Sequence, residues 1–330
     1  MLEASDKIWV TWENQRRNIS LTSELNIPLY VFDSRHKGAR RYFDCILETL
    51  KVIKKNRPKI LIVQNPSIIL ATLSIFLKRR YRYKIVVDAH NSGLNPKEGR
   101  FKALNLWASW ILKHSDTTIV SNETLVDTVT QSKGFACVLA DPLPKIPPLE
   151  KQQLEGSFNA LFICSWADDE PFLEIIEAAK LLPNDYRIYI TGNWKKVTNQ
   201  LPNKIPDNVV LTGFISTEDF DALLISSQVS IDLTTREGCL VCGAYEALAI
   251  AKPQILSDTK TLRKTFSQGA IFTQNSAKDI ANAILDAHKD LPTLQKDAEL
   301  QRTKFISIWS KQRDTFEEHL TKLTRSTYRQ

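Results

Sequence analysis

The feature that most constrains the fold is the alternation of short apolar runs with longer amphipathic segments along nearly the whole chain. Some short runs are apolar at every position, such as residues 60–63 (ILIV) and 85–87 (IVV). Strands of this kind are typical of sheets that are covered on both faces. Regular alternation of strand and helix predicts parallel sheets joined by right-handed crossovers. The sequence therefore indicates the α/β fold class.

The chain is 330 residues long, which exceeds the usual size of a single hydrophobic core. Residues 141–148 contain four prolines, which can continue neither a helix nor a central strand. We predict a first domain over residues 1–147, a linker over 148–157, a second domain over 158–305, and a C-terminal helix over 306–330 that packs back on the first domain. The expected strands lie at 8–11, 29–32, 60–63, 85–87, 118–120 and 137–139, then at 160–164, 187–191, 209–212, 229–232, 254–256 and 270–272.

Several broad classes are excluded by simple counts. The longest mainly apolar run, residues 67–77, has 11 residues, whereas a membrane-spanning helix needs about 18. No secretory leader precedes the first expected strand. The five cysteines are too scattered for a disulfide framework, which favours a reducing compartment. We therefore expect a cytoplasmic protein.

The net charge of +7 is unevenly distributed. Residues 1–150 hold 23 Lys and Arg against 14 Asp and Glu, a balance of +9, whereas residues 151–330 hold 21 against 23, a balance of −2. Two basic clusters, residues 51–59 and 78–84 (KRRYRYK), supply much of the excess. This asymmetry suggests an anionic partner for the first half, such as a membrane surface, a phosphorylated lipid or a nucleic acid, and we expect the two clusters to form one surface beside the ligand-binding cleft. The alternative is a solvated rim.

Motifs for common cofactors are missing. With ten glycines, the chain contains neither G-x-G-x-x-G after a strand nor G-x-x-x-x-G-K-[ST], which argues against a dehydrogenase or a P-loop NTPase. Cys239 and Cys242 form one C-x-x-C pair with no second pair of zinc ligands. The acidic pair at 168–169 is adjacent rather than spaced as D-x-D, and the pair at 219 and 221 lies within a probable helix rather than in a loop at a strand end. We expect no cofactor and no metal.

The stretch from 229 to 258 is the richest in candidate site residues. An apolar strand leads into a loop, a helix begins near Gly243, and Lys252-Pro253 ends it. Loops at the carboxyl ends of parallel strands bind ligands, and the free N–H groups of a helix N-terminus favour phosphate. Glu246, expected in the first helical turn, either binds a sugar hydroxyl or only complements the helix dipole.

This stretch resembles the donor-binding signature of GT-B glycosyltransferases, and most closely the retaining family-four group with its Glu-x7-Glu motif. That group reads E-G-F-G-x-x-x-x-E-A-x-A-x-G-x-P, and Glu237-Gly238, Glu246-Ala247, Ala249 and Pro253 match it. The resemblance implies two Rossmann-like domains facing a central cleft, long C-terminal helices, and a nucleotide sugar on the second domain. The residues expected to bind the nucleotide sugar are Gly192, Lys195, Lys196, Gly213, Phe214, Arg236, Gly238, Cys242, Gly243 and Glu246.

Some positions depart from that signature. Glu237 and Glu246 are nine residues apart rather than eight, and the loop at 165–170 is acidic where the family has Arg and Lys. Lys195, Lys196 and Arg236 are the expected substitutes that neutralise the diphosphate. The sequence therefore predicts a divergent member of the group.

The resemblance places Asp88, His90 and Glu237 in the catalytic role and Asn91 beside the acceptor, although Asn91 or Ser92 as a helix cap is the alternative. The remaining acceptor candidates follow the first strand, where Trp can stack on a sugar ring and Arg can bind a phosphate or carboxylate. These candidates are Trp12, Glu13, Arg16 and Arg17.

The predicted function is the metal-independent transfer of a sugar from a nucleoside diphosphate sugar, with a UDP-sugar favoured, in bacterial surface polysaccharide synthesis. The expected partners are the donor, a glycan or lipid-linked acceptor, and an anionic membrane surface that would hold the protein peripherally at the inner face. Nucleic acid is not an expected partner. The alternatives are a nucleotide-sugar 2-epimerase of the same fold, or a non-catalytic module that binds nucleotide sugar or nucleic acid.

Overall fold

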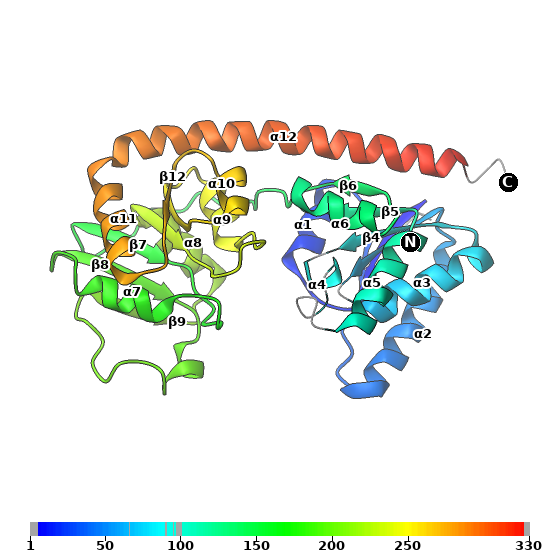
Figure 1. The fold of residues 1–330 in the computed structure, drawn as a ribbon, viewed down its shortest axis with the longest axis horizontal. Coiled ribbons are helices and arrows are strands. Elements are labelled where there is room, and N and C mark those ends of the chain that lie inside the picture. The colour runs from blue at the N-terminus through cyan, green and yellow to red at the C-terminus, as the bar shows by residue number, and fades with distance from the viewer. Residues whose placement is uncertain (1–5, 66, 90, 95, 97–100, 327–330) are drawn as a thin grey trace. The chain divides into compact units, whose positions relative to one another are not determined.

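The computed structural model describes residues 6–65, 67–89, 91–94, 96 and 101–326. The chain divides into two compact units, unit 1 with residues 1–142 and 307–330, and unit 2 with residues 143–306 (Figure 1). Each unit contains one six-stranded sheet in which every strand pairing is parallel. The predicted α/β class is confirmed. All twelve predicted strands are present, with ends that differ by at most two residues.

The sheet of unit 1 has the strand order β2-β1-β3-β4-β5-β6. Its two central strands are apolar over residues 60–63 and 85–87, and Val63 pairs with Val10 on one side and with Val87 on the other. Because these strands are buried, helices must cover both faces of the sheet. The strands are β1 (Lys7–Thr11), β2 (Leu29–Val31), β3 (Ile60–Asn65), β4 (Lys84–Ala89), β5 (Thr117–Val120) and β6 (Ala136–Val138).

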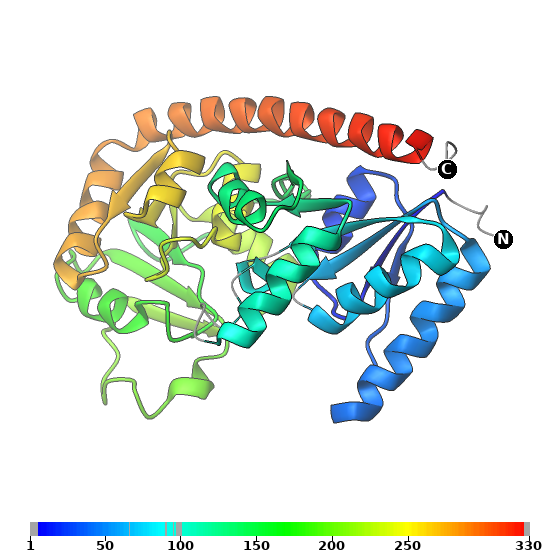
Figure 2. The same ribbon diagram turned by 45° about the vertical axis from the view of Figure 1, so that its right-hand side comes forward.

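One hydrophobic core of unit 1 joins β1, β3 and β4 to the helices on one face, among them α2, α3 and α5. In both views α3 and α5 lie next to each other on this face (Figure 2). The helices are α1 (Arg16–Glu24), α2 (Gly38–Asn56), α3 (Ile68–Tyr81), α4 (Asn91–Leu94), α5 (Lys102–His114), the 3-10 turn η2 (Glu123–Leu125) and α6 (Val126–Gln131).

The C-terminal helix α12 (Leu291–Ser326) contributes its residues from 307 onward to unit 1. Trp309 Nε1 donates to the Ala140 carbonyl at 3.0 Å, and His319 Nε2 lies 2.6 Å from Thr117 Oγ1 on β5. Phe316 and Leu320 are fully buried. These contacts attach the end of the chain to the sheet that its beginning forms.

The sheet of unit 2 has the order β12-β11-β10-β7-β8-β9. Counted from the first strand of the unit, this is the 3-2-1-4-5-6 order of doubly wound nucleotide-binding folds. The strands are β7 (Phe158–Phe162), β8 (Tyr186–Thr191), β9 (Val209–Gly213), β10 (Val229–Asp232), β11 (Gln254–Ser257) and β12 (Ala270–Thr273).

Helices cover both faces of this sheet. Ile175 on α7 and Ile284 on α11 share a core with alternate residues of β7, while Leu224 on α8 and Ala247 on α9 pack with Leu161. The elements are α7 (Phe172–Ala179), the 3-10 turn η3 (Trp194–Val197), α8 (Thr217–Ser226), α9 (Cys242–Ala249), α10 (Lys260–Thr265) and α11 (Ala277–Lys289).

The proline-rich stretch at residues 141–148 lies in a segment without helix or strand, as its composition predicts. Residues 139–157 form neither helix nor strand. Within the described ranges, no helix is long and apolar enough to cross a bilayer.

Candidate functional site

The topology of unit 2 indicates where a ligand would bind. From β7 the chain continues to β8 on one side, while β10 is the neighbour on the other side. At this reversal of strand order the loops after β7 and β10 leave the sheet toward opposite faces. The carboxyl ends of two such strands form the crevice in which doubly wound folds bind ligands. The relevant loops are residues 163–171 and 233–241.

Asp232, the last residue of β10, occupies the N-terminus of α9. Its buried carboxylate accepts hydrogen bonds from the backbone N–H groups of Gly243 and Ala244. A Cβ at Gly243 would lie 2.5 Å from Asp232 Oδ2, so a side chain there would displace this carboxylate. The helix N-terminus in which we predicted a phosphate is therefore already occupied by a carboxyl group of the protein itself.

The charge on Asp232 is costly. Burial, followed by the negative charges of Glu170 and Glu246, raises the pKa of Asp232 well above its usual range. The two hydrogen bonds from α9 oppose that rise because they stabilise the ionised form. Three carboxyl groups therefore interact around the start of α9.

Glu170 organises the acidic loop that follows β7. Its carboxylate accepts from the backbone N–H groups of Ser165 and Ala167, each at 2.9 Å, and from the Ser165 hydroxyl at 2.9 Å. The loop therefore directs its N–H groups at its own glutamate. Glu170 therefore holds the loop together by hydrogen bonds, in the same loop where the family resemblance leads one to expect Arg and Lys.

The β10–α9 loop is attached to the same β7 loop. Thr234 Oγ1 donates to Asp169 Oδ2 at 2.8 Å, and the Thr235 N–H donates to the Asp169 carbonyl at 2.8 Å. Arg236, a predicted diphosphate ligand, is largely exposed and has its Nε 3.7 Å from Asp169 Oδ2. The two loops at the crevice therefore form one connected unit.

Glu237 and Glu246 lie in different environments. Glu237 is exposed, and its Oε1 accepts from the Lys260 N–H at 2.6 Å, which caps α10. Glu246 is buried. We expected Glu246 in the first turn of its helix, but α9 begins at Cys242, its first turn has no acidic residue, and Glu246 is its fifth residue. That expectation was wrong because the helix begins one residue earlier than predicted.

The other predicted donor residues gather at the same edge of the sheet. Gly192 has a φ of +86°, and a Cβ there would lie 2.1 Å from the Cys164 carbonyl oxygen, so the ends of β7 and β8 meet closely. Its N–H donates to the Gly213 carbonyl at 3.0 Å, which joins the end of β9. Phe214 is 88% exposed. Lys195, Lys196, Gly238 and Cys242 are also exposed, and Gly243 is buried.

Sequence reasoning missed Asp232 and Glu170. The available signal was a carboxylate that ends an apolar strand directly ahead of a glycine at a helix start. A second signal was a glutamate, Glu170, followed by a proline and then by the apolar start of α7 at Phe172.

In unit 1, the expected roles of Arg17 and Asp88 are corrected. Arg17 Nη2 donates to Asp88 Oδ1 at 2.9 Å and to the Leu139 carbonyl at 3.0 Å, and Nη1 pairs with Asp141. Asp88 is fully buried. Burial alone would lower the pKa of Arg17, but Asp141 and Asp88 outweigh it and hold that pKa above its ordinary value. These groups satisfy each other inside the fold, so neither is placed to contact an acceptor or a sugar.

Trp12 also differs from its predicted role of stacking on an acceptor. The side chain is 2% exposed, and Nε1 donates to Thr49 Oγ1 on α2 at 3.0 Å. Because its ring belongs to the core between β1 and α2, it offers no face to a sugar.

The remaining unit 1 candidates stay untested. Glu13 is partly exposed and accepts from Gln15 Nε2 at 2.9 Å. Arg16 begins α1 and Asn91 begins α4, but neither side chain is described. His90 lies outside the described residues.

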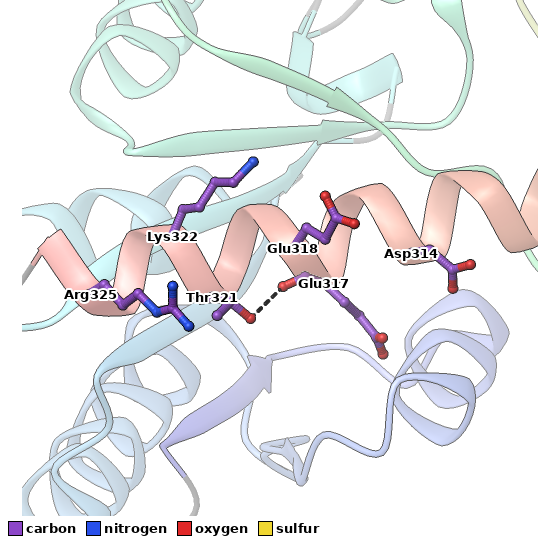
Figure 3. A pocket seen from close by; sticks show the side chains of 6 residues that line it. All are labelled: Asp314, Glu317, Glu318, Thr321, Lys322 and Arg325. Carbon is purple, nitrogen blue, oxygen red and sulfur yellow. Dashed lines mark hydrogen bonds between the residues drawn. The ribbon is translucent and has the colours of Figure 1, made fainter.

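A surface hollow of about 440 Å³ lies along α12 (Figure 3). It has acidic and basic side chains one helical turn apart, and Thr321 Oγ1 donates to the Glu317 carbonyl at 2.9 Å. Its lining has three acidic and two basic side chains, and no predicted site residue is among them. The lining residues are Asp314, Glu317, Glu318, Thr321, Lys322 and Arg325.

Over the described part of the chain, no group of three or more His, Cys, Asp or Glu side chains is arranged to hold a metal ion. Metal independence of the reaction stays a prediction.

The sequence of unit 2 matches a known family. Residues 155–302 match the family model described as glycosyl transferases, group 1. The match covers 148 of the 330 residues and lies wholly within unit 2, so unit 2 is similar to group 1 glycosyltransferases. This agrees with the motif around Glu237 and Glu246, while the retaining family-four subgroup stays a prediction. Among curated proteins, none matches the sequence.

Solved structures with the same fold cover nearly the whole chain. Sucrose-phosphate synthase from Thermosynechococcus elongatus has a TM-score of 0.72 at 13% identity, over 90% of this chain and 81% of that one. Anabaena Alr3699/HepE in complex with UDP has a TM-score of 0.71 at 12% identity, over 94% and 99%. A glycosyltransferase from Rickettsia africae ESF-5 has a TM-score of 0.67 at 16% identity, over 98% and 99%. These similarities show that the chain has the GT-B fold that the sequence predicted.

Proposed function

We propose that the protein transfers a sugar from a UDP-sugar to a glycan or lipid-linked acceptor. The observation that carries the proposal is the family match over residues 155–302, which includes both loops of the crevice between β7 and β10. Structures of Anabaena HepE, which has the same fold, were solved with UDP and with UDP-glucose. These complexes support UDP as the nucleotide part of the donor. The proposed setting is bacterial surface polysaccharide synthesis, in the cytoplasm at the inner face of the membrane.

The donor is proposed to lie across the carboxyl ends of β7 to β10, with Glu246 accepting from sugar hydroxyls. Phe214 is the exposed ring nearest the end of β9 on which a base can stack. Because Asp232 already takes the N–H groups of Gly243 and Ala244, the diphosphate is assigned instead to exposed basic side chains. Lys195, Lys196 and Arg236 would stabilise the leaving diphosphate electrostatically, with no metal in the mechanism.

The experiment is UDP titration by calorimetry with Glu246→Ala. Loss of a charge-assisted hydrogen bond is expected to weaken UDP or UDP-sugar binding by roughly 10- to 100-fold. Glu246→Gln keeps the size and is the matched control for packing, and thermal unfolding checks that both variants fold. Wild-type affinity in Glu246→Ala would remove this site from the proposal.

The diphosphate assignment has its own comparison. Lys195→Ser/Lys196→Ser is expected to weaken UDP binding, whereas Lys278→Ser/Lys289→Ser removes the same charge from exposed positions of α11 and is expected to leave it unchanged. Equal losses of UDP affinity in the two variants would mean that UDP binding depends only on the net charge of unit 2.

A nucleotide-sugar 2-epimerase is the second candidate. A putative UDP-N-acetylglucosamine 2-epimerase from Listeria monocytogenes has the same fold, with a TM-score of 0.62 at 12% identity over 89% of this chain and 91% of that one. Product analysis separates the two functions. A transferase gives UDP and a glycosylated acceptor only when an acceptor is present, whereas an epimerase gives an epimeric UDP-sugar without one.

A further inference from the structure

Helices α3 and α5 present large apolar side chains to solvent side by side. Trp107 Nε1 donates to Thr72 Oγ1 at 2.8 Å, and the rings of Phe76 and Trp110 have centroids 5.6 Å apart. These contacts join the two helices but leave Phe76 70% exposed, Leu106 73% and Trp107 40%. Soluble surfaces seldom gather apolar groups of this size unless they bind something.

The same two helices carry only positive charge. Neither α3 nor α5 contains Asp or Glu. Lys78 is engaged with the His114 carbonyl at 3.1 Å and with Asp116 at 3.2 Å. Arg79, Arg80 and Lys113 are exposed in the last turns of the two helices. We define the α3/α5 face as Phe76, Leu106, Trp107, Arg79, Arg80 and Lys113.

The position of this face corrects an expectation about the basic clusters. In a parallel α/β sheet, the helix that follows a strand runs back toward the amino ends of the strands. The clusters at 51–59 and 78–84 therefore lie at the amino edge of the sheet, just ahead of β3 and β4. Asp88 and the ends of β1 and β3 lie at the opposite, carboxyl edge, so the clusters do not border the acceptor residues that we predicted.

We propose that the α3/α5 face docks on an anionic bilayer. Phe76, Leu106 and Trp107 enter the headgroup region, where a Trp ring is well accommodated, while the Arg and Lys groups bind lipid phosphates. Charge complementarity favours an anionic bilayer as the partner, because the α3/α5 face contains basic residues and no acidic residue. The docking goes beyond the proposed function and does not depend on donor binding. If both hold, docking brings the enzyme to a lipid-linked acceptor.

The test is co-sedimentation of the full chain with vesicles of phosphatidylcholine alone or mixed with phosphatidylglycerol, at low and high salt. Wild-type protein is expected on the anionic vesicles at low salt and in solution at high salt. Arg79→Ser/Arg80→Ser is expected to weaken partitioning about 30-fold at low salt. Phe76→Ser/Leu106→Ser is expected to weaken it at least about tenfold, because two exposed apolar groups can no longer insert.

Two control variants match these changes. Lys54→Ser/Lys55→Ser removes the same charge from exposed positions of α2, and Leu181→Ser/Leu300→Ser removes apolar groups that are similarly exposed in unit 2. Both are expected to partition within a few-fold of wild type. Unfolding temperatures and UDP affinities should be unchanged in all four variants, since each altered side chain is exposed.

Three results would overturn the proposal. The first is equal retention of wild-type protein on neutral and anionic vesicles. The second is a loss in the control variants as large as in the α3/α5 variants. The third is a wild-type dimer in light scattering that Phe76→Ser/Leu106→Ser makes monomeric, without vesicle binding by either protein, which would identify the face as a contact between two copies.

Discussion

The substitution Arg17→Met is expected to destabilise unit 1 strongly. The Arg17 guanidinium is nearly buried between Asp88, which has no exposed surface, and Asp141, which is about a third exposed. Replacing it with Met keeps the length and the apolar stem but leaves the Asp88 carboxylate without the guanidinium. Removing one partner of a buried ion pair costs about 3–5 kcal/mol, because the other charge remains in a low-dielectric site. Asp141 adds little to this loss, since exposed pairs contribute about 1 kcal/mol or less.

Thermal unfolding measures this loss. For a unit of roughly 150–250 residues each kcal/mol lowers the unfolding temperature by about 2–4 °C, so a drop of about 6–20 °C is expected in the transition of unit 1. The double variant Arg17→Met/Asp88→Asn should recover part of the loss, because the buried charge is then absent as well. The transition of unit 2 provides an internal reference within the same sample.

A small effect would refute this reasoning. If Arg17→Met costs less than about 1 kcal/mol, the pair behaves like an exposed one. Arg17 would then be accessible, and its sequence-based role as an acceptor ligand would have to be reconsidered. A double variant no more stable than Arg17→Met alone would show that the loss does not come from the charge of the Asp88 carboxylate.

Three further outcomes are expected. The pKa of Asp232 is raised in the folded state, so the stability that Asp232 contributes is complete below its ordinary pKa of about 4 and is lost as pH rises through its folded-state pKa. The unfolding temperature of wild-type protein should therefore fall over this pH range, and Asp232→Asn should flatten the fall. An unchanged slope in the variant would contradict the assignment. Gly213→Ala should lower the free energy of unfolding by about 1–2 kcal/mol, because of the positive φ alone. Gly192→Ala should lower it by about 1–3 kcal/mol more, because the added Cβ would also meet the Cys164 carbonyl. Equal losses of the two variants in urea unfolding would contradict this reasoning. Turnover should survive EDTA, and restoration of lost activity by a divalent ion would show that a metal takes part.

The fold was predictable because its strands are nearly continuous apolar runs. Residues 60–63 and 85–87 have few alternatives to a buried parallel strand, and the prolines at 142–148 mark where the rhythm stops. Strand ends were less certain, since a polar residue such as Asp88 can either end a strand or be its last buried member. Here β4 continues through Ala89, and Asp88 is fully buried within it.

The candidate site was only partly predictable. The motif around Glu237 and Glu246 predicted a loop followed by a helix after β10, and the structure has both, because a loop that joins the end of a parallel strand to a helix has a recognisable composition. Trp12 and Arg17 were misassigned because sequence position gives the edge of the sheet but not the direction of a side chain. Trp12 points into the core toward Thr49 on α2, which lies 37 residues away in the chain.

The acidic character of the crevice connects the departures in sequence to the chemistry of the donor. The diphosphate of the proposed donor would bring negative charge to a place where burial and the charges of Glu170 and Glu246 already raise the pKa of Asp232. The family resemblance leads one to expect Arg and Lys in the β7 loop to offset that charge, but in this chain Glu170 occupies the N–H groups of that loop. In the proposed complex, neutralisation would come from the exposed Lys195, Lys196 and Arg236 or from a proton held by Asp232. Basic side chains would make donor binding stronger at lower salt, because screening weakens their attraction to phosphate. A proton on Asp232 would make it stronger at lower pH, because protonation removes a repulsion.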